Sequence, residues 1–293
     1  QGLWTPRHAL TRGMRFVTAG SCFAQHISRW LRANGHTWLD AEPAPADLDP
    51  ATAAALGHGV FSFRTGNIYS AALLAQWLRW AEDPAQAPDE AWEEQGRWFD
   101  PFRPAIPPDG EAGRDALLAS RRRSLLAMRD ALAEADVFIF TLGLTETWLD
   151  ERGWVYPLCP GTVRGRFDAD RHRFANFGVA DVVGHVEQAL QRMQRINPDL
   201  KLLLTVSPVP LTATASDRHV LVATTHSKSV LRAAAAELVS RHPAVDYFPA
   251  YELIAGSASR GRWFDDNLRT VTREGVDHVM SHFALGLGDA VAE

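Results

Sequence analysis

The sequence predicts an α/β fold in which helices cover a mainly parallel sheet. Short β-rich runs alternate with longer segments of helical periodicity along the 293 residues, which is the pattern of such a sheet. The clearest apolar runs, residues 137–142 and 202–206, have the length of strands. A composition of 46% hydrophobic and 22% charged residues is that of an ordinary globular protein. No repeat or linker divides the chain, so we expect a single domain over residues 1–293.

The first predicted unit is a strand, a tight turn and a helix. Residues 15–19 are apolar and β-branched, which favours a strand. The helix predicted over residues 24–33 places Ile27 and Leu31 on one face, and Gly35 supplies a stop signal.

The next part of the chain contains a predicted helix and an irregular insertion. Residues 43–50 are rich in Pro, Ala and Asp and predict a loop, and residues 70–81 predict a helix. Residues 82–113 combine many prolines with little periodicity, which predicts an insertion or a lid. The large aromatic side chains of this insertion either stack on sugars, cover an acyl chain or form ordinary core: Trp92, Trp98, Phe99 and Phe102.

The rest of the chain continues the alternation of helices and strands. The predicted helices are residues 114–135, 182–196, 225–241 and 273–285, and the predicted strands are residues 136–142, 202–206 and 244–248. In a parallel sheet, ligands bind beyond the carboxyl ends of the strands. We therefore expect the loops at Gly20, Gly143, Ser207 and Tyr251 to converge on one site.

The charge balance argues against nucleic acid and membranes as partners. Thirty Lys and Arg residues against 35 Asp and Glu residues give a net charge of −5, so polyanions are not generally attracted. No apolar stretch approaches the roughly 20 residues needed to span a bilayer. Neither a dinucleotide-binding glycine pattern nor a P-loop is present, and no cofactor is implied.

The two cysteines predict reduced thiols rather than a disulfide. Cys22 follows a strand and Cys159 lies in a loop flanked by proline, so we expect free thiols in a cytoplasm. No N-terminal signal pattern is visible, and a signal removed earlier would place the protein in a periplasm instead. His278 and His282 lie four apart on a helix, but no third ligand stands at a suitable spacing, so no metal site is predicted.

Ser21 and Cys22 place two candidate nucleophiles in the turn before the helix at residues 24–33. A helix N-terminus, with its dipole and free N–H groups, stabilises a thiolate or an oxyanion. Either side chain can attack an acyl carbon from this position. The structural alternative is that Ser21 caps the helix and Cys22 is a small buried apolar residue.

Residues 20–24 read letter for letter as the signature of the GSCFA-domain family, and the chain resembles that family over nearly its whole length. The other segments that resemble it follow in matching order: 66–69, 141–148, 205–209, 227–228 and 247–252. The family is grouped with the SGNH/GDSL hydrolases. This resemblance implies a flavodoxin-like three-layer α/β/α sandwich with a mainly parallel sheet, and ester-hydrolysis or acyl-transfer chemistry.

The resemblance also implies a nucleophile position and a base position. Overlaying the superfamily's Gly-Asp-Ser motif on this turn places Cys22, rather than Ser21, where the nucleophile stands. The superfamily's Asp-x-x-His matches Asp266 to Arg269, so that an arginine replaces the general base. Arginine does not accept a proton at neutral pH. Arg269 can instead hold a carboxylate, a phosphate or a sugar acid, or it pairs with Asp265 or Asp266.

Two segments resemble the oxyanion-hole motifs of the superfamily, which uses the nucleophile's N–H, a Gly and an Asn. Gly66 matches the Gly, with Asn67 beside it, although a plain turn explains this pair equally well. Gly143 to Glu146 falls where Gly-x-Asn-Asp would be, so that Thr145 replaces the Asn. The oxyanion donor is then either the hydroxyl of Thr145 or the amide of Asn67.

Other residues are candidates for the missing base and for charge at the site. His219 is the first choice as base because its loop follows a strand end, and His226 and His278 are further choices. Lys228 is one of only two lysines in the chain. It contacts an anionic substrate, lowers the pKa of the Cys22 thiol, or is simply a solvated lysine near a helix start.

These residues together predict an acyl esterase or an O-acyltransferase with a covalent acyl-enzyme on Cys22 or Ser21. The expected partners are a small-molecule or glycan substrate, an acylated carbohydrate or glycoconjugate above all, and in a transferase an acyl donor. The alternative is a catalytically degenerate module that binds a glycan or peptide. The sequence does not define the oligomeric state.

Overall fold

The central sheet has five parallel strands in a flavodoxin-like order. The computed structural model describes residues 2–288 of the chain. The strand order is β2-β1-β5-β9-β10, which is 2-1-3-4-5 when these strands are counted along the chain. Every neighbouring pair is parallel. The strands are β1 (Arg15–Gly20), β2 (Thr37–Trp38), β5 (Val137–Leu142), β9 (Lys201–Val206) and β10 (Val245–Phe248).

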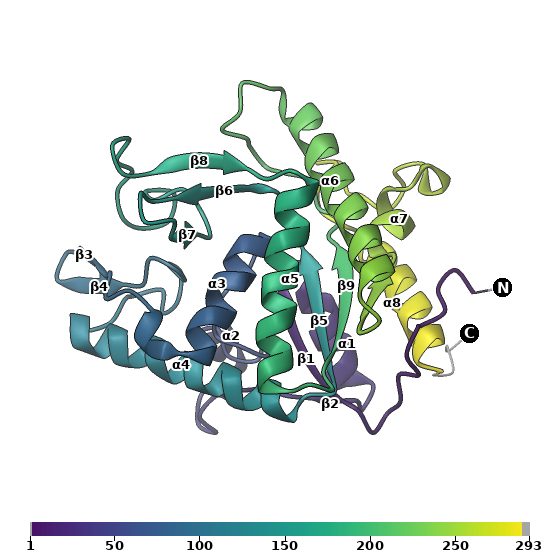
Figure 1. Cartoon of the computed structure of the whole chain (residues 1–293), viewed down its shortest axis with the longest axis horizontal. Helices are drawn as coiled ribbons and strands as arrows, with labels where there is room; N and C mark the ends of the chain where they lie inside the picture. The colour runs from purple at the N-terminus through teal and green to yellow at the C-terminus, as the bar shows by residue number, and fades with distance from the viewer. Residues whose placement is uncertain (1, 289–293) are drawn as a thin grey trace.

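Helices cover both faces of this sheet (Figure 1). One face carries α3 (Ala71–Glu82), α4 (Arg114–Glu134), α5 (Val179–Ile196) and α6 (Val220–Arg241), and the other carries α1 (Ala24–Ala33), α7 (Ala250–Ala255) and α8 (Arg273–Leu287). The alternation along β5 separates the two cores, since Phe138 and Phe140 pack on the first side and Val137 and Ile139 on the second. The expected three-layer α/β/α sandwich is therefore confirmed.

Most long elements begin and end close to the residues that the sequence predicts. The helix expected over residues 24–33 has these same bounds. The helix expected over residues 225–241 begins earlier, at Val220, because His219 caps it. The backbone N–H of Leu221 donates to Nδ1 of His219 over 3.2 Å, which satisfies one of the free donors at the helix start.

Two small antiparallel sheets lie outside the central one, and the sequence does not predict either. One contains β6 (Glu146–Leu149), β7 (Val155–Tyr156) and β8 (Arg173–Asn176), and the other β3 (Trp92–Glu94) and β4 (Arg97–Phe99). The remaining short elements are α2 (Pro50–Ala55), η1 (Pro84–Gln86) and η2 (Ser257–Ser259). Strands of two to four residues are too short for an alternating pattern to be recognised.

The insertion at residues 82–113 is attached to the fold by buried ion pairs. The carboxylate of Asp100 accepts hydrogen bonds from Arg103 of the insertion and from Arg121 of α4, at 2.8–3.0 Å. All three side chains are only 1–2% exposed. Phe99 and Phe102 are buried in the same region, so these two aromatic rings form ordinary core rather than a sugar-stacking surface.

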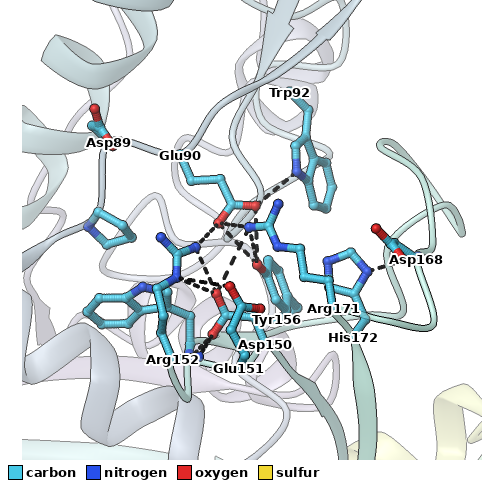
Figure 2. Close-up of polar contacts among 12 residues, drawn as sticks. Asp89, Glu90, Trp92, Asp150, Glu151, Arg152, Tyr156, Asp168, Arg171 and His172 are labelled. Atoms are coloured by element: carbon cyan, nitrogen blue, oxygen red, sulfur yellow. Dashed lines mark hydrogen bonds and ion pairs between the residues drawn. The ribbon is translucent and has the colours of Figure 1, made fainter.

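A second polar cluster ties the insertion to the β6–β7–β8 sheet (Figure 2). The carboxylate of Glu90 accepts hydrogen bonds from the hydroxyl of Tyr156 and the indole N–H of Trp92, each over 3.1 Å. Arg171 and Arg152 lie 2.7 and 3.2 Å from the same carboxylate. These contacts and those of Asp100 hold the insertion at two places.

Candidate active site

A cavity of about 560 Å³ opens at the carboxyl ends of β1, β5 and β9. It lies at the point where the strand order reverses between β1 and β5, which is where flavodoxin-like folds bind their ligands. Cys22, Gly143 and Ser207 line it, so three of the four expected strand-end loops converge. Tyr251 does not line it. The chain passes directly from β10 into α7, where the carboxylate of Glu252 accepts a hydrogen bond from Tyr247.

Cys22 and Ser21 both line this cavity, but their exposure differs. Cys22 is half-buried and is a free thiol, whereas Ser21 is 2% exposed and its hydroxyl makes no hydrogen bond within residues 2–288. Ser21 does not cap α1, because the residue at the cap position is Phe23 and no side chain caps this helix. The structural alternative for Ser21 is therefore not observed, and Cys22 is the more accessible nucleophile.

The turn that carries Cys22 is held tightly against β5. Gly20 has a φ of +137°, and a Cβ atom there would lie 2.5 Å from the carbonyl oxygen of Thr141. The N–H of Ser21 donates to that same oxygen over 3.1 Å. Only glycine fits this backbone conformation and this close approach, which explains the glycine that opens the motif.

Two backbone donors at the N-terminus of α1 are unused. Within residues 2–288, neither the N–H of Cys22 nor that of Phe23 makes a hydrogen bond, whereas the N–H of Ala24 donates to Ser21. Both free donors lie at the positive end of the helix dipole and next to the Cys22 thiol. This arrangement suits the negative charge that develops on a carbonyl oxygen under attack.

The loop after β5 is held in place by hydrogen bonds to side chains of α6. The ammonium nitrogen of Lys228 donates to the carbonyl oxygen of Gly143 over 2.6 Å, and the N–H of Thr145 donates to the hydroxyl of Ser227 over 3.0 Å. The N–H of Gly143 in turn donates to the carbonyl oxygen of Tyr69 over 2.9 Å. The amide groups of this loop are therefore engaged in structure, and Gly143 has no N–H left for an oxyanion.

The structure directs Thr145 away from the cavity. Its side chain is fully buried, and its hydroxyl donates to Oδ1 of Asn176 in β8 over 2.6 Å. Glu146, the next residue, does line the cavity and accepts a hydrogen bond of 2.6 Å from the hydroxyl of Thr214. The hydroxyl of Thr145 is thus already used, whereas the side chain of Glu146 lines the cavity.

Gly66 and Asn67 line a second cavity of about 220 Å³ and not the one beside Cys22. Oδ1 of Asn67 is buried without a hydrogen-bond partner among the described residues. The two cavities adjoin, because Tyr69, Pro157 and Leu158 line both. Of these two cavities, residues 103–106 of the insertion line only the smaller one. No residue of the insertion lines the larger cavity, so the insertion is not a lid over Cys22.

Tyr69 separates the two cavities and keeps its proton. Burial raises the pKa of Tyr69 to about 12, the charge of Cys22 adds to this, and Arg269 opposes it. The hydroxyl makes no hydrogen bond within residues 2–288, so it is a free donor at the cavity wall. The sequence includes Tyr69 in a family segment but gives no separate sign of this role.

Arg269 lies at the cavity without an ion-pair partner. It lines the cavity from the loop before α8, and its guanidinium forms no salt bridge or hydrogen bond with any of residues 2–288. The expected pairing with Asp265 or Asp266 does not occur. Asp266 is exposed and does not line the cavity, since Asn267 and Thr270 organise this loop through their own hydrogen bonds. Of this segment, therefore, only Arg269 reaches the cavity.

None of the described histidines lines the larger cavity. His219 is exposed and serves as the cap of α6, His226 is exposed on the same helix, and the ring of His278 stacks on Trp263 with centroids 4.8 Å apart. The structure therefore does not bring a histidine to Cys22.

The walls of the cavity contain residues that the sequence does not single out for this site. Trp148 of β6 and Phe174 of β8 form an aromatic wall, and Ser207 together with residues 209–215 forms another part of the lining. Cys159 lines the same cavity as Cys22, and burial raises the pKa of its thiol. These residues come from short strands and irregular loops, which lack a recognisable pattern.

Residues 2–288 contain neither a cluster of metal-ligand side chains nor a membrane-spanning helix. No three His, Cys, Asp or Glu side chains within residues 2–288 are grouped closely enough to bind a metal ion. Among the helices of these residues, none combines the length and apolar character needed to cross a membrane.

The fold and the site define a flavodoxin-like α/β/α protein with a thiol nucleophile candidate in the turn after its first strand. The chain belongs to the GSCFA family, whose model matches residues 15–283. No curated protein matches it. A crystal structure of a carbohydrate esterase family 3 from Talaromyces cellulolyticus is similar, with a TM-score of 0.42 and 9% sequence identity over 94% of this chain and 96% of that chain.

Proposed function

We propose that the protein is an acyl esterase or O-acyltransferase that carries the acyl group on Cys22. The observation that carries this proposal is the half-buried thiol of Cys22 at a cavity, beside its own free N–H and that of Phe23. A nucleophile and free backbone donors beside it are the parts that acyl transfer needs. Ser21 is less suited because the residue is 2% exposed and its hydroxyl is buried.

The reaction proceeds in two balanced steps. The sulfur of Cys22 attacks the carbonyl carbon of the substrate ester, the C–O bond breaks, and the alcohol leaves with one proton. The thioester is then attacked by water or by a sugar hydroxyl, which releases the acid or the new ester and restores the thiol. The N–H groups of Cys22 and Phe23 stabilise the oxyanion in both steps.

The walls of the cavity suit an acylated carbohydrate. Trp148 and Phe174 offer aromatic faces for a sugar ring, and the Glu146–Thr214 pair offers hydrogen-bonding groups for hydroxyls. The unpaired guanidinium of Arg269 favours a substrate with a carboxylate or a phosphate.

The mass of the intact protein after incubation with p-nitrophenyl acetate or acetyl-CoA tests the covalent step. We expect one acetyl group on the wild type and on Ser21→Ala, and none on Cys22→Ala. Cys159→Ala is the matched control, because this second thiol lines the same cavity and should not carry the acetyl group. An adduct that survives in Cys22→Ala would contradict the assignment of the nucleophile.

The lack of a histidine at the cavity favours one second candidate, a module that binds an acylated glycan without cleaving it. In that case no variant carries an adduct with either donor, and glycan binding to the wild type is unchanged in Cys22→Ala. Loss of acyl release in Cys22→Ala would exclude this candidate.

The role of Arg269 is tested with a pair of esters that differ in charge. Arg269→Gln should lower the ratio of kcat/KM for mono-p-nitrophenyl succinate to that for p-nitrophenyl acetate by about 10- to 100-fold, since hydrogen bonds to charged groups contribute about 1.5–3 kcal/mol. Arg262→Gln is the control, because Arg262 lies in the same loop over the ring of Trp263 and does not line the cavity. An unchanged ratio in Arg269→Gln would refute the role.

A further inference from the structure

Lys228 is a buried lysine without a counter-ion. Its side chain is 2% exposed, and its single hydrogen bond within residues 2–288 goes to the neutral carbonyl oxygen of Gly143. No described carboxylate lies within ion-pair distance of it. A charged ammonium group in such a place costs free energy, because burial removes its hydration and no counter-ion compensates for the loss.

The charged and titratable groups that act on Lys228 come from two neighbouring segments. They are the thiol of Cys22, in the turn before α1, and the guanidinium of Arg269, in the loop before α8. Burial lowers the pKa of Lys228 to about 7, the negative charge of a Cys22 thiolate opposes this, and Arg269 adds to it. Above this pH the nitrogen has a free electron pair.

The other groups near Cys22 do not serve as proton acceptors. No described histidine lines the cavity, and Arg269 is permanently charged. Tyr69 holds its proton up to a pKa of about 12. Glu146 lines the cavity, but its carboxylate is held by the hydroxyl of Thr214 and has no electrostatic interaction with Cys22 among the described residues. Lys228 does not line the cavity itself, but its amine lies 2.6 Å from the carbonyl oxygen of Gly143, which does, and it interacts electrostatically with Cys22. The amine of Lys228 is therefore the remaining base beside the thiol.

We propose that Lys228 is the proton acceptor for Cys22, in place of the histidine that related hydrolases use, and that it acts directly or across one water molecule. As the sulfur attacks the ester carbonyl, the S–H proton moves to the amine. The same proton passes to the alcohol oxygen when the C–O bond breaks, so charge and protons balance. The carbonyl oxygen of Gly143 accepts one N–H and so orients the amine. The ester step rests on the proposed function, whereas the proton transfer from the thiol does not.

Alkylation by iodoacetamide tests the thiol without any ester. In a Cys159→Ala background, the alkylation rate of Cys22 should rise with an inflection near pH 7, where the amine becomes neutral. In Lys228→Met the inflection should move up by at least one pH unit, toward the ordinary ionisation of a thiol at about 8.5. An unchanged inflection in Lys228→Met would overturn the proposal.

Acylation by p-nitrophenyl acetate then separates proton transfer from a structural role. Lys228→Arg keeps a positive charge and donors for Gly143, but it cannot accept a proton. It should therefore slow acylation about 10²- to 10⁴-fold, the usual contribution of a general base, as Lys228→Met does. A structural role would instead be rescued by arginine, and acylation within about threefold of the wild type in Lys228→Arg would overturn the proposal.

One control variant and the use of two separate assays keep the outcomes distinct. Lys201→Met removes the other lysine of the chain, which begins β9 and so stands at the end of that strand away from the cavity, and should leave both profiles unchanged. A wild type that is alkylated with an inflection near pH 7 but is never acylated would refute the proposed function and leave the proton acceptor in place. If Lys228→Met does not fold, Lys228→Arg still decides the matter through its acylation rate.

Discussion

Replacing Asp100 by asparagine removes a negative charge that the structure places between two buried arginines. Asp100→Asn keeps the shape of the side chain and the hydrogen bond from the N–H of Phe102, but leaves the guanidinium groups of Arg103 and Arg121 without a counter-charge. No other described carboxylate pairs with either arginine. Their remaining partners, which include the hydroxyl of Ser124 and backbone carbonyl oxygens, are neutral.

The expected cost follows from this burial. Removing one partner of a buried ion pair costs about 3–5 kcal/mol, because the charge left behind is neither hydrated nor paired. For a chain of this length, that loss corresponds to a fall in Tm of about 5–10 °C. The matched control is Asp130→Asn on α4, whose carboxylate is 69% exposed and should change the free energy of unfolding by less than about 0.5 kcal/mol.

Urea unfolding followed by circular dichroism at several pH values measures this effect. Burial alone raises the pKa of Asp100, but the charges of Arg121 and Arg103 more than offset it, so that its pKa lies below the ordinary value. Its stabilisation is therefore fully present above about pH 4 and is lost as the pH falls through the lower, folded-state pKa. The wild type and Asp100→Asn should converge in acid. A loss at pH 7 no larger than that of Asp130→Asn would refute the reasoning.

Three further substitutions test the turn, a helix and the loop after β5. Gly20→Ala should cost at least about 1–3 kcal/mol in urea unfolding, since its Cβ meets the carbonyl oxygen of Thr141. Gly184→Ala, in α5 with open space around the new Cβ, should instead stabilise the protein by up to about 1 kcal/mol. A Gly184→Ala variant less stable than Gly20→Ala would contradict this explanation of the two glycines. Thr145→Val should cost about 0.5–1.5 kcal/mol, the net contribution of one hydrogen bond to the exposed Asn176, yet keep the acylation rate of Cys22 within about threefold. A loss of 10²-fold or more in rate would mean that Thr145 is an oxyanion donor after all.

Long apolar and amphipathic segments account for the part of the fold that the sequence predicts well. β5 is buried along its whole length and reads as an uninterrupted apolar run, and α1 has one apolar face between clear end signals. Their alternation defines a parallel sheet, and the parallel sheet places Cys22 and Gly143 at one edge. The position of the turn at Ser21 and Cys22 could thus be predicted from the sequence, because the order of strands and helices determines where this turn lies.

The remaining parts of the site depend on contacts between residues that lie far apart in the chain. Thr145 reads as an oxyanion donor in the sequence, but its hydroxyl is used by Asn176, which no local pattern reveals. The same holds for Lys228, which the sequence does not distinguish from a solvated helix residue until the loop at Gly143 is seen to cover it. Burial of a single polar side chain is a tertiary property, and periodicity does not record it.

The cavity beside Cys22 is lined by buried strands at its floor and by less buried segments at its walls. These two parts should therefore differ in how well they tolerate substitutions. Its floor is the carboxyl edge of β1, β5 and β9, strands that are buried almost throughout, so that almost any substitution there is felt by both cores. Part of its upper walls comes from residues 209–215, none of which is buried and which therefore carry little of the packing. Under the proposed function, replacing this segment should change which ester is preferred while the acylation of Cys22 is kept.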